Sequence, residues 1–239
     1  MERLQKRIAS LGYCSRRHAE ELILKGLVEV NGEVVTKLGS CVKPSDVIVV
    51  EGNILDNNKF YEYYLLNKPK GVVTTTNDEK GRKTVIDLID TTTRIYPVGR
   101  LDYDTTGALI LTNDGNLANL LMSPNSMVDK TYVVKVKGIV EVMDVQKLRS
   151  GIVIDGVKTK RAKARIKSID KKKGVSVVVV TIHEGKNHQI KKMFEKLGYK
   201  VVKLRRETIG NLNLKSLMPG EYRALSIKEV KVLYSLCKK

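Results

Sequence analysis

The second half of the chain contains three segments whose patterns are typical of β-strands. In "KTYVVKVKG" (130–138), the alternate residues from Tyr132 to Val136 share an apolar face, and two lysines lie on the other face. "KTKRAKARIKSIDKKK" (158–173) alternates in the same way, and "VSVVVVTIHEG" (175–185) is typical of a central strand. Hairpins are more frequent than strict strand–helix–strand units. The sequence therefore predicts an α+β domain with a mixed, largely antiparallel sheet flanked by helices.

Further strands and two helices complete this predicted domain. "YYLLNKPKGVVTTT" (63–76) predicts a strand, a turn and a second strand, and "ALILTNDG" (108–115) predicts a buried strand. "NLANLLMS" (116–123) predicts a short helix. "NHQIKKMFEKLG" (187–198) has apolar residues at helical spacing, which leaves Lys191 on the solvent side.

The first 52 residues predict a separate small module. Apolar residues recur at helical spacing over 3–11, and Ser15 can cap a second helix that ends at Gly26. Asn31-Gly32 between two short apolar runs is a strong hairpin signal. The polar, turn-rich stretch 53–62 predicts a linker, which gives a first domain of residues 1–58 and a second of residues 59–239.

The net charge of +18 is unevenly distributed along the chain. Residues 1–60 hold 9 Lys/Arg and 8 Asp/Glu, whereas residues 61–239 hold 35 and 18. A positive field of this size attracts polyanions, and it exceeds what a soluble surface needs. The charge therefore favours a nucleic acid as partner.

The composition also indicates the cellular compartment in which the protein is expected. No run of 18 apolar residues exists, and the start "MERLQKRIAS" lacks the apolar core of a signal peptide. The three cysteines are widely scattered, which is typical of reduced thiols. We expect a cytoplasmic protein that does not enter the membrane.

Several kinds of active site are excluded by the motifs they require. The chain has no phosphate loop ending in Gly-Lys-Ser/Thr, no HExxH and no GxSxG. What remains is the carboxylate pair Asp102 and Asp104 in "GRLDYDTTG" (99–107), directly before an apolar run. Their spacing alone leaves open a Mg²⁺ site of a nuclease, a glycosidase pair, or an Asp102 that only caps a turn.

Two sets of motifs resemble known RNA-modifying proteins. "LGYCSRRHAEELILKGLVEVNGEVV" (11–35) resembles the S4-like (alpha-L) RNA-binding domain. "GRLDYDTTG" is similar to the catalytic motif of pseudouridine synthases, and further motifs follow in that family's order over almost the whole chain. They are "LLNKPKGVVTT", "DKTYVVKVKG", "HEGKNHQIKKMFEKLGYKVVKLRRETIG" and "LMPGEYRAL". The resemblance is strongest to the RsuA/RluB branch, which acts on ribosomal RNA.

This resemblance implies a role for each matching residue. Asp102 would be the catalytic residue at the ribose–uracil junction, with Tyr132 against the uracil and Lys186 as the cation beside the aspartate. Leu204 would line the pocket, and Arg100 would help to stabilise the gap left by the flipped base. The reaction is an isomerisation within one nucleotide, so no ATP, redox carrier or metal is expected as a cofactor. Burial raises the pKa of a carboxylic acid, so a cation is needed to keep Asp102 ionised.

The basic residues suggest how the RNA is held. We expect backbone phosphates to contact Arg16 and Arg17 in the first domain, and Lys163, Arg165 and Lys167 on the strand predicted for 158–173. The resemblance favours 23S rRNA near the peptidyl-transferase centre. A 16S rRNA target, a secondary tRNA target and a pre-ribosomal particle remain open, and a monomer is expected. The alternatives are an RNA-binding ribosome-assembly factor without catalysis and a metal-dependent nuclease.

Overall fold

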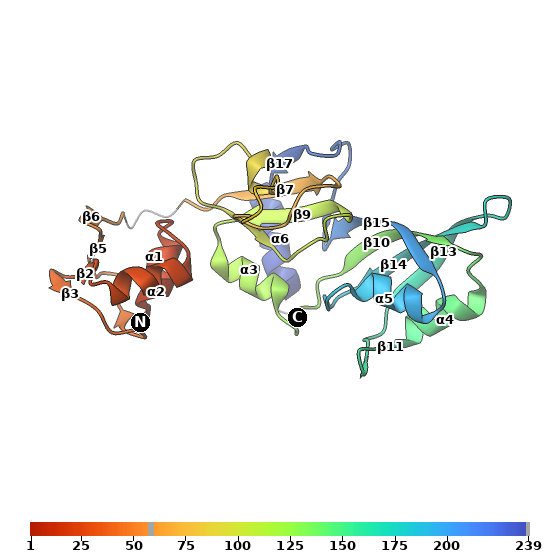
Figure 1. Cartoon of the computed structure of the whole chain (residues 1–239), viewed down its shortest axis with the longest axis horizontal. Coiled ribbons are helices and arrows are strands. Elements are labelled where there is room, and N and C mark those ends of the chain that lie inside the picture. The colour runs from red at the N-terminus through yellow and green to blue at the C-terminus, as the bar shows by residue number, and fades with distance from the viewer. Residues whose placement is uncertain (57–59, 238–239) are drawn as a thin grey trace. The chain divides into compact units, whose positions relative to one another are not determined.

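The computed structural model describes residues 1–56 and 60–237, which form two compact units (Figure 1). The predicted domain boundary between residues 58 and 59 lies outside the described residues. No helix in the described ranges is long and apolar enough to span a membrane. The first unit contains Met1–Glu62, Thr91–Ile95 and Asn113–Gly115, and the second contains Tyr63–Asp90, Tyr96–Thr112 and Asn116–Lys239.

The first unit forms from the capping and turn residues that its sequence predicts. The Ser15 hydroxyl accepts the backbone N–H of His18 at 3.1 Å, so helix α2 (Arg16–Leu24) begins directly after it. Asn31 and Gly32 have φ values of 53° and 86°, as a two-residue hairpin turn requires. The other elements are α1 (Leu4–Ser10), β1 (Glu2–Arg3), β2 (Val28–Val30), β3 (Glu33–Val34), β4 (Cys41–Val42), β5 (Ile48–Val50) and β6 (Asn53–Ile54).

The second unit is built on one sheet of nine strands among the described residues. The strands are β7 (Tyr63–Lys68), β8 (Tyr96–Val98), β9 (Thr106–Thr112), β10 (Lys130–Lys137), β13 (Lys163–Asp170), β14 (Val175–Ile182), β15 (Lys200–Ile209), β16 (Leu212–Asn213) and β17 (Tyr222–Ala224). The order is β13-β14-β10-β15-β9-β7-β17, with β8 beside β9 and β16 beside β15. Among the described strands of this sheet, β15 and β9 form the one parallel pair, which confirms the predicted mixed, largely antiparallel sheet.

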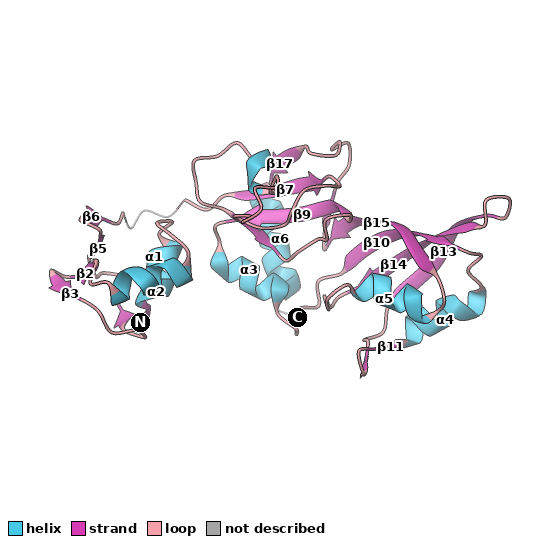
Figure 2. Cartoon of the chain, in the orientation of Figure 1, coloured by secondary structure: helices cyan, strands magenta, loops and turns pink. Residues whose placement is uncertain are grey.

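Helices cover different ends of this sheet (Figures 1 and 2). Helices α3 (Gly115–Met122) and α6 (Ile227–Cys237) pack on the end that contains β7 and β9, where apolar residues form one core. Helices α4 (Val142–Ser150) and α5 (Gln189–Lys196) pack on the other end, against β13 and β15. The remaining elements are the short hairpin β11 (Val153–Ile154) and β12 (Val157–Lys158), and the 3-10 turn η1 (Ile86–Leu88).

Strands β9 and β15 approach each other closely at Gly107. A Cβ atom at this position would lie 2.1 Å from the backbone oxygen of Arg206, and Gly107 has a φ of +111°. Only glycine fits such a position, because any side chain would meet the backbone of the neighbouring strand. The last glycine of "GRLDYDTTG" therefore fixes the start of β9, and with it the aspartate-bearing turn before it, against β15.

Two predicted strands differ from the observed ones. The second strand predicted within 63–76 is absent, since Val73 makes only an isolated bridge with Thr84. The strand predicted over 158–173 is divided, because β12 ends at Lys158 and β13 begins at Lys163.

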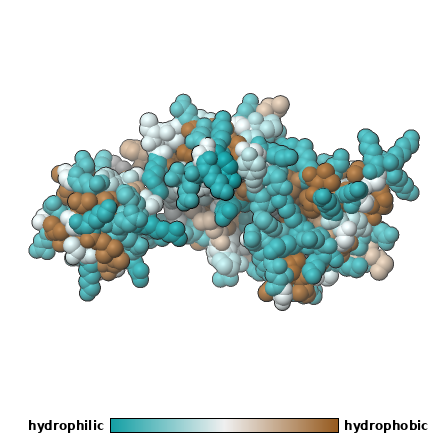
Figure 3. Space-filling view, viewed as in Figure 1, coloured by the Kyte–Doolittle hydropathy of each residue, from teal (hydrophilic) through white to brown (hydrophobic). Residues whose placement is uncertain are grey.

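The face of the molecule drawn in Figure 3 is largely hydrophilic, with small separate apolar patches.

Candidate active site

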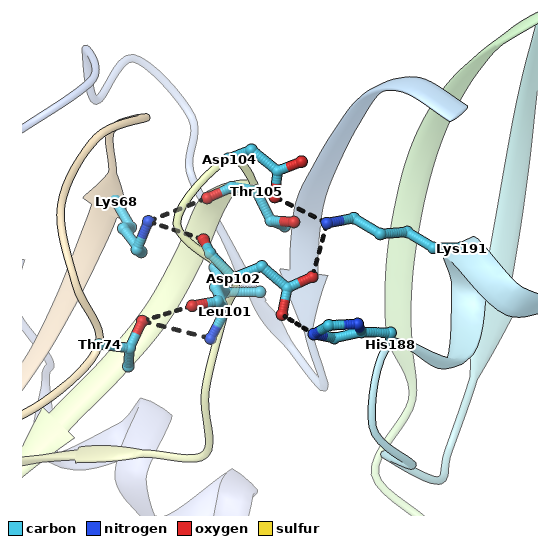
Figure 4. A network of polar contacts seen from close by, with 8 residues as sticks. All are labelled: Lys68, Thr74, Leu101, Asp102, Asp104, Thr105, His188 and Lys191. Atoms are coloured by element: carbon cyan, nitrogen blue, oxygen red, sulfur yellow. Dashed lines mark hydrogen bonds and ion pairs between the residues drawn. The ribbon is translucent and has the colours of Figure 1, made fainter. Parts of the chain in front are cut away.

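Asp102 lies in a tight turn that precedes β9. Its backbone oxygen accepts the N–H of Thr105 at 3.1 Å, and its carboxylate points toward the start of α5 (Figure 4). There Lys191 Nζ lies 2.8 Å from one carboxylate oxygen, and His188 Nε2 lies 3.3 Å from the other. The Asp102 side chain is 30% exposed, so it can be reached from solvent. One accessible carboxylate is thus held between two nitrogen groups.

Lys191 joins the two aspartates of the motif. Its ammonium also lies 2.7 Å from Asp104, which is the more exposed of the two carboxylates. Partial burial lowers the pKa of Lys191, but its hydrogen bonds to Asp102 and Asp104 outweigh this effect and the pKa is raised. The hydrogen bond from Lys191 likewise lowers the pKa of Asp104. Among the described residues, no group of three or more His, Cys, Asp or Glu side chains is placed to hold a metal ion.

Lys68, the last residue of β7, holds the same turn from its other side (Figure 4). Its side chain is fully buried, and Nζ donates to the backbone oxygens of Pro69, Asp102 and Thr105, each at 3.1 Å. Burial lowers the pKa of Lys68 to about 8, although the nearby carboxylates of Asp102 and Asp104 act in the opposite direction. Lys68 therefore fixes the backbone of the turn, whereas the Asp102 carboxylate is contacted by Lys191 and His188.

Thr74 adds a further support next to Asp102. Its buried hydroxyl donates to the backbone oxygen of Leu101 at 2.7 Å and accepts the N–H of the same residue at 3.3 Å. Both polar groups of the residue before Asp102 are therefore bonded to one side chain. This fixes the direction in which the chain enters the turn.

Tyr132 and Leu204 lie on the sheet face covered by α4 and α5, as alternate buried residues of β10 and β15. Tyr132 is 8% exposed and is paired with Arg206, whose guanidinium Nη1 lies 3.5 Å from the tyrosine hydroxyl. Arg206 is itself buried and donates to the backbone oxygen of Ala108 at 2.7 Å. Its other terminal nitrogen has no partner among the described residues. The sheet thus places an aromatic ring beside a buried cation with an unused donor.

The predicted pairing of Lys186 with Asp102 is wrong in this structure. Lys186 is exposed, and its Nζ donates to the backbone oxygen of Lys158 at 3.4 Å. The chain turns at His188, which has a φ of 52°, and this turn brings Lys191 rather than Lys186 to the aspartate. The prediction that Lys191 lies on the solvent side is therefore also wrong.

The other predicted residues lie apart from this cluster. Arg100 is exposed and lines a hollow of about 400 Å³ with the loop that contains Thr74 and Asn77. Arg16 and Arg17 are exposed in the first turn of α2. The other three predicted RNA contacts are exposed residues of β13: Lys163, Arg165 and Lys167.

Lys167 departs from the predicted alternation. Ile166 pairs with Val178 and Ser168 pairs with Val177, so Lys167 is the extra residue of a β-bulge. A bulge redirects its side chain relative to Lys163 and Arg165, so the three do not form one regular row. Pattern analysis cannot detect this, because the bulge depends on the partner strand.

Sequence reasoning missed Lys68, His188 and Lys191. Lys68 belongs to the predicted turn "KPKG", where a lysine side chain is expected to lie in solvent. The others stand at the start of α5, where the helical pattern assigned them to no partner. A useful signal was the presence of two basic residues, three positions apart, at the start of a predicted helix.

Comparison with known proteins identifies the family of this chain. The family model described as RNA pseudouridylate synthase matches residues 62–196, and the S4 domain model matches residues 2–48. The chain is 52% identical to ribosomal large subunit pseudouridine synthase B of Bacillus subtilis, over 99% of this chain and 97% of that protein. It is 36% identical to the dual-specificity RNA pseudouridine synthase RluF of Escherichia coli, over 98% and 79% of the two chains.

A solved structure supports the same assignment over the whole chain. A crystal structure described as pseudouridylate synthase superposes with a TM-score of 0.69 at 35% identity, covering 98% of this chain and all of the other. The S4 domain followed by a domain built on a mixed sheet is therefore a known architecture. The chain belongs to the pseudouridine synthase family of isomerases, in its RsuA/RluB branch.

Proposed function

We propose that this chain isomerises one uridine of ribosomal RNA to pseudouridine, in 23S rRNA near the peptidyl-transferase centre, with Asp102 as the catalytic residue. The observation that carries the proposal is the Asp102 carboxylate, accessible and held by Lys191 and His188. The 52% identity to a synthase named for the large ribosomal subunit favours 23S over 16S rRNA. A cytoplasmic monomer that acts on rRNA or on a pre-ribosomal particle is the form we propose.

The chemistry requires one carboxylate at the junction of ribose and uracil. The bond from the ribose carbon to the uracil nitrogen breaks, the base turns, and a bond from the same ribose carbon to C5 of uracil forms. The C5 proton leaves and the former glycosidic nitrogen gains a proton, so the product is an isomer of the substrate. Asp102 acts as nucleophile or base in this sequence, and Lys191 and His188 hold its carboxylate.

The other residues bind and orient the nucleotide. Tyr132 stacks on the uracil, and Leu204 lines the pocket on the same sheet face. Arg100 stabilises the gap that the flipped base leaves. Lys191 takes the role that the family resemblance assigned to Lys186, because it is the lysine in contact with Asp102.

The remaining cations hold the RNA outside the pocket. Arg16 and Arg17 contact backbone phosphates in the first unit. In the second unit, Lys163, Arg165 and Lys167 contact phosphates from β13.

The proposal is tested by mapping pseudouridine across total rRNA with carbodiimide-dependent primer extension. Cells that lack this protein are compared with cells restored by the wild type or by Asp102→Asn. Loss of one site, recovered only with the wild type, supports the proposal and identifies the uridine. If every site persists, or if Asp102→Asn restores the mark, an RNA-binding assembly factor becomes the better account.

A further inference from the structure

Strands β13, β14, β10 and β15 have a second face, opposite to the one that carries Tyr132, Leu204 and Arg206. Side chains alternate along each strand, so the residues between the buried ones point to this opposite face. Its central row consists of Arg165, Val179, Val133 and Arg205, which are neighbours across the four strands. The rows on its two sides begin in β13 at Lys163 and at Ser168. We call these three rows together the open sheet face.

All the charged residues among the paired positions of the open sheet face are cations. Its twelve paired positions carry five cations, four hydroxyl groups and three valines, and none of them is aromatic. One acidic residue adjoins this face, because Glu207 is the extra residue of a β-bulge between Arg206 and Thr208 in β15. None of the twelve is buried. The cations are Lys163 and Arg165 in β13, Lys135 in β10, and Lys203 and Arg205 in β15. The cations of β13 and β15 therefore stand on either side of a strip of valine and threonine.

The arginines of the central row are separated by three strand spacings. Adjacent strands lie about 4.8 Å apart, which places the two backbones about 14 Å from each other. Arg165 is exposed and Arg205 is half-buried, so neither side chain is closed off from a ligand that approaches from solvent.

A groove extends the cationic surface along β13. It has a volume of about 820 Å³ and is lined by Arg149 and Arg161 together with Lys163 and Arg165 of the open sheet face. Lys163 also forms an ion pair of 3.0 Å with Asp129, but both side chains are exposed. Such a pair contributes little and is easily exchanged for a phosphate.

We propose that the open sheet face binds the backbone of an RNA duplex, with phosphates at its two cationic edges and ribose hydroxyls over the threonines between them. The wide, shallow minor groove of RNA displays 2′-hydroxyl groups to a surface of this kind. Single-stranded RNA is held mainly by stacking on aromatic side chains, and the open sheet face has none.

This inference rests on the proposed function and adds a second contact to it. Tyr132 and Arg206 alternate with Val133 and Arg205 on the same strands, so the pocket and the open sheet face lie on opposite sides of the sheet. One straight helix cannot occupy both. The substrate is therefore a folded RNA in which a duplex outside the target segment reaches around the sheet.

The test compares Arg165→Glu/Arg205→Glu in the full chain with a control of the same charge change, Lys228→Glu/Lys231→Glu on exposed positions of α6. The probe is a fluorescent RNA duplex of about 20 base pairs without unpaired residues, beside a DNA duplex of equal sequence. We expect the first variant to weaken RNA duplex binding on the order of tenfold and to lower the salt slope by about 2. The control should stay within about twofold, and the DNA duplex should bind more weakly than RNA.

Equal RNA duplex binding by the two charge-reversal variants would overturn the inference. A milder variant, Arg165→Gln/Arg205→Gln, keeps the test valid if the reversal disturbs folding, and it should lose binding in the same direction. Turnover on a minimal hairpin should be unchanged in the control Lys228→Glu/Lys231→Glu, since these lysines belong neither to the contacts of Asp102 nor to the open sheet face. If the wild type forms no pseudouridine while duplex binding responds as expected, the proposed function fails and the binding surface stands.

Discussion

Two lysines hold the Asp102 turn from its two sides, and their surroundings differ completely (Figure 4). Lys68 is fully buried and contacts three backbone oxygens but no carboxylate oxygen. Lys191 is 27% exposed and contacts the carboxylates of Asp102 and Asp104. The pKa of Lys68 is lowered by burial, whereas the pKa of Lys191 is raised by its partners.

These different contacts give the two lysines different roles. A buried ammonium that donates to carbonyls fixes where the backbone runs. The ammonium of Lys191 instead contacts the carboxylate that is accessible to substrate. Removing the first should therefore affect stability most, and removing the second should affect turnover most.

Among the residues that contact the Asp102 turn, Lys191→Gln is expected to have the largest effect on turnover. Without the ammonium, Asp102 loses its shortest ionic contact, and we expect turnover to fall on the order of 100-fold to 1000-fold. The matched control is Lys186→Gln, which should retain turnover within about twofold because the Lys186 ammonium donates to the backbone oxygen of Lys158 and not to Asp102. A greater loss in Lys186→Gln than in Lys191→Gln would show that the enzyme uses the other lysine.

Lys68→Met should act chiefly on stability. Methionine fills the volume but leaves three backbone oxygens without their charged donor, and we expect the free energy of unfolding to fall by about 2–3 kcal/mol. Urea denaturation followed by circular dichroism measures this change. An unchanged unfolding midpoint would show that the three contacts do not stabilise the turn.

The difference in free energy of unfolding between the wild type and Lys68→Met should depend on pH, because of the pKa of Lys68. This pKa is about 8 in the folded chain, below the ordinary value of 10.5. Between these values the unfolded chain binds more protons, so the contribution of Lys68 to the free energy of unfolding increases with pH. We expect the stability of the wild type relative to Lys68→Met to rise by about 2 kcal/mol between pH of about 7.5 and 9.5. Parallel curves for the two proteins would contradict this assignment.

The smallest effect is expected for His188→Asn. Asparagine tolerates the left-handed backbone at this position, so the turn into α5 is retained. The variant loses only a half-exposed contact of 3.3 Å, and turnover should fall by no more than about fivefold. A loss as large as that of Lys191→Gln would place the two residues in one equally important pair.

Much of this architecture could be predicted from the sequence, because local signals determine it. The Ser15 cap, the Asn31-Gly32 turn and the alternation over 130–138 act within a few residues, and each predicted the observed element. The position of Asp102 before a buried strand is of the same kind. Family resemblance supplied the chemistry that spacing alone left open.

The partners of Asp102 could not be predicted, because they depend on contacts between distant segments. Lys68 and Lys191 are separated from Asp102 by 34 and 89 positions in the sequence, and only the fold brings them to the turn. The left-handed residue His188 decides which lysine reaches the aspartate, and a helical pattern does not reveal it. Lys167 was misplaced for a similar reason, since its bulge is defined by the neighbouring strand.

The most direct test of the central claim uses purified protein and an rRNA transcript labelled with tritium at C5 of uridine. Isomerisation releases that tritium to water, so the release counts turnovers at whichever uridine is modified. We predict release by the wild type, background release by Asp102→Asn, and equal RNA binding by both proteins. Release by Asp102→Asn at the wild-type rate would contradict the claim that this carboxylate carries the reaction.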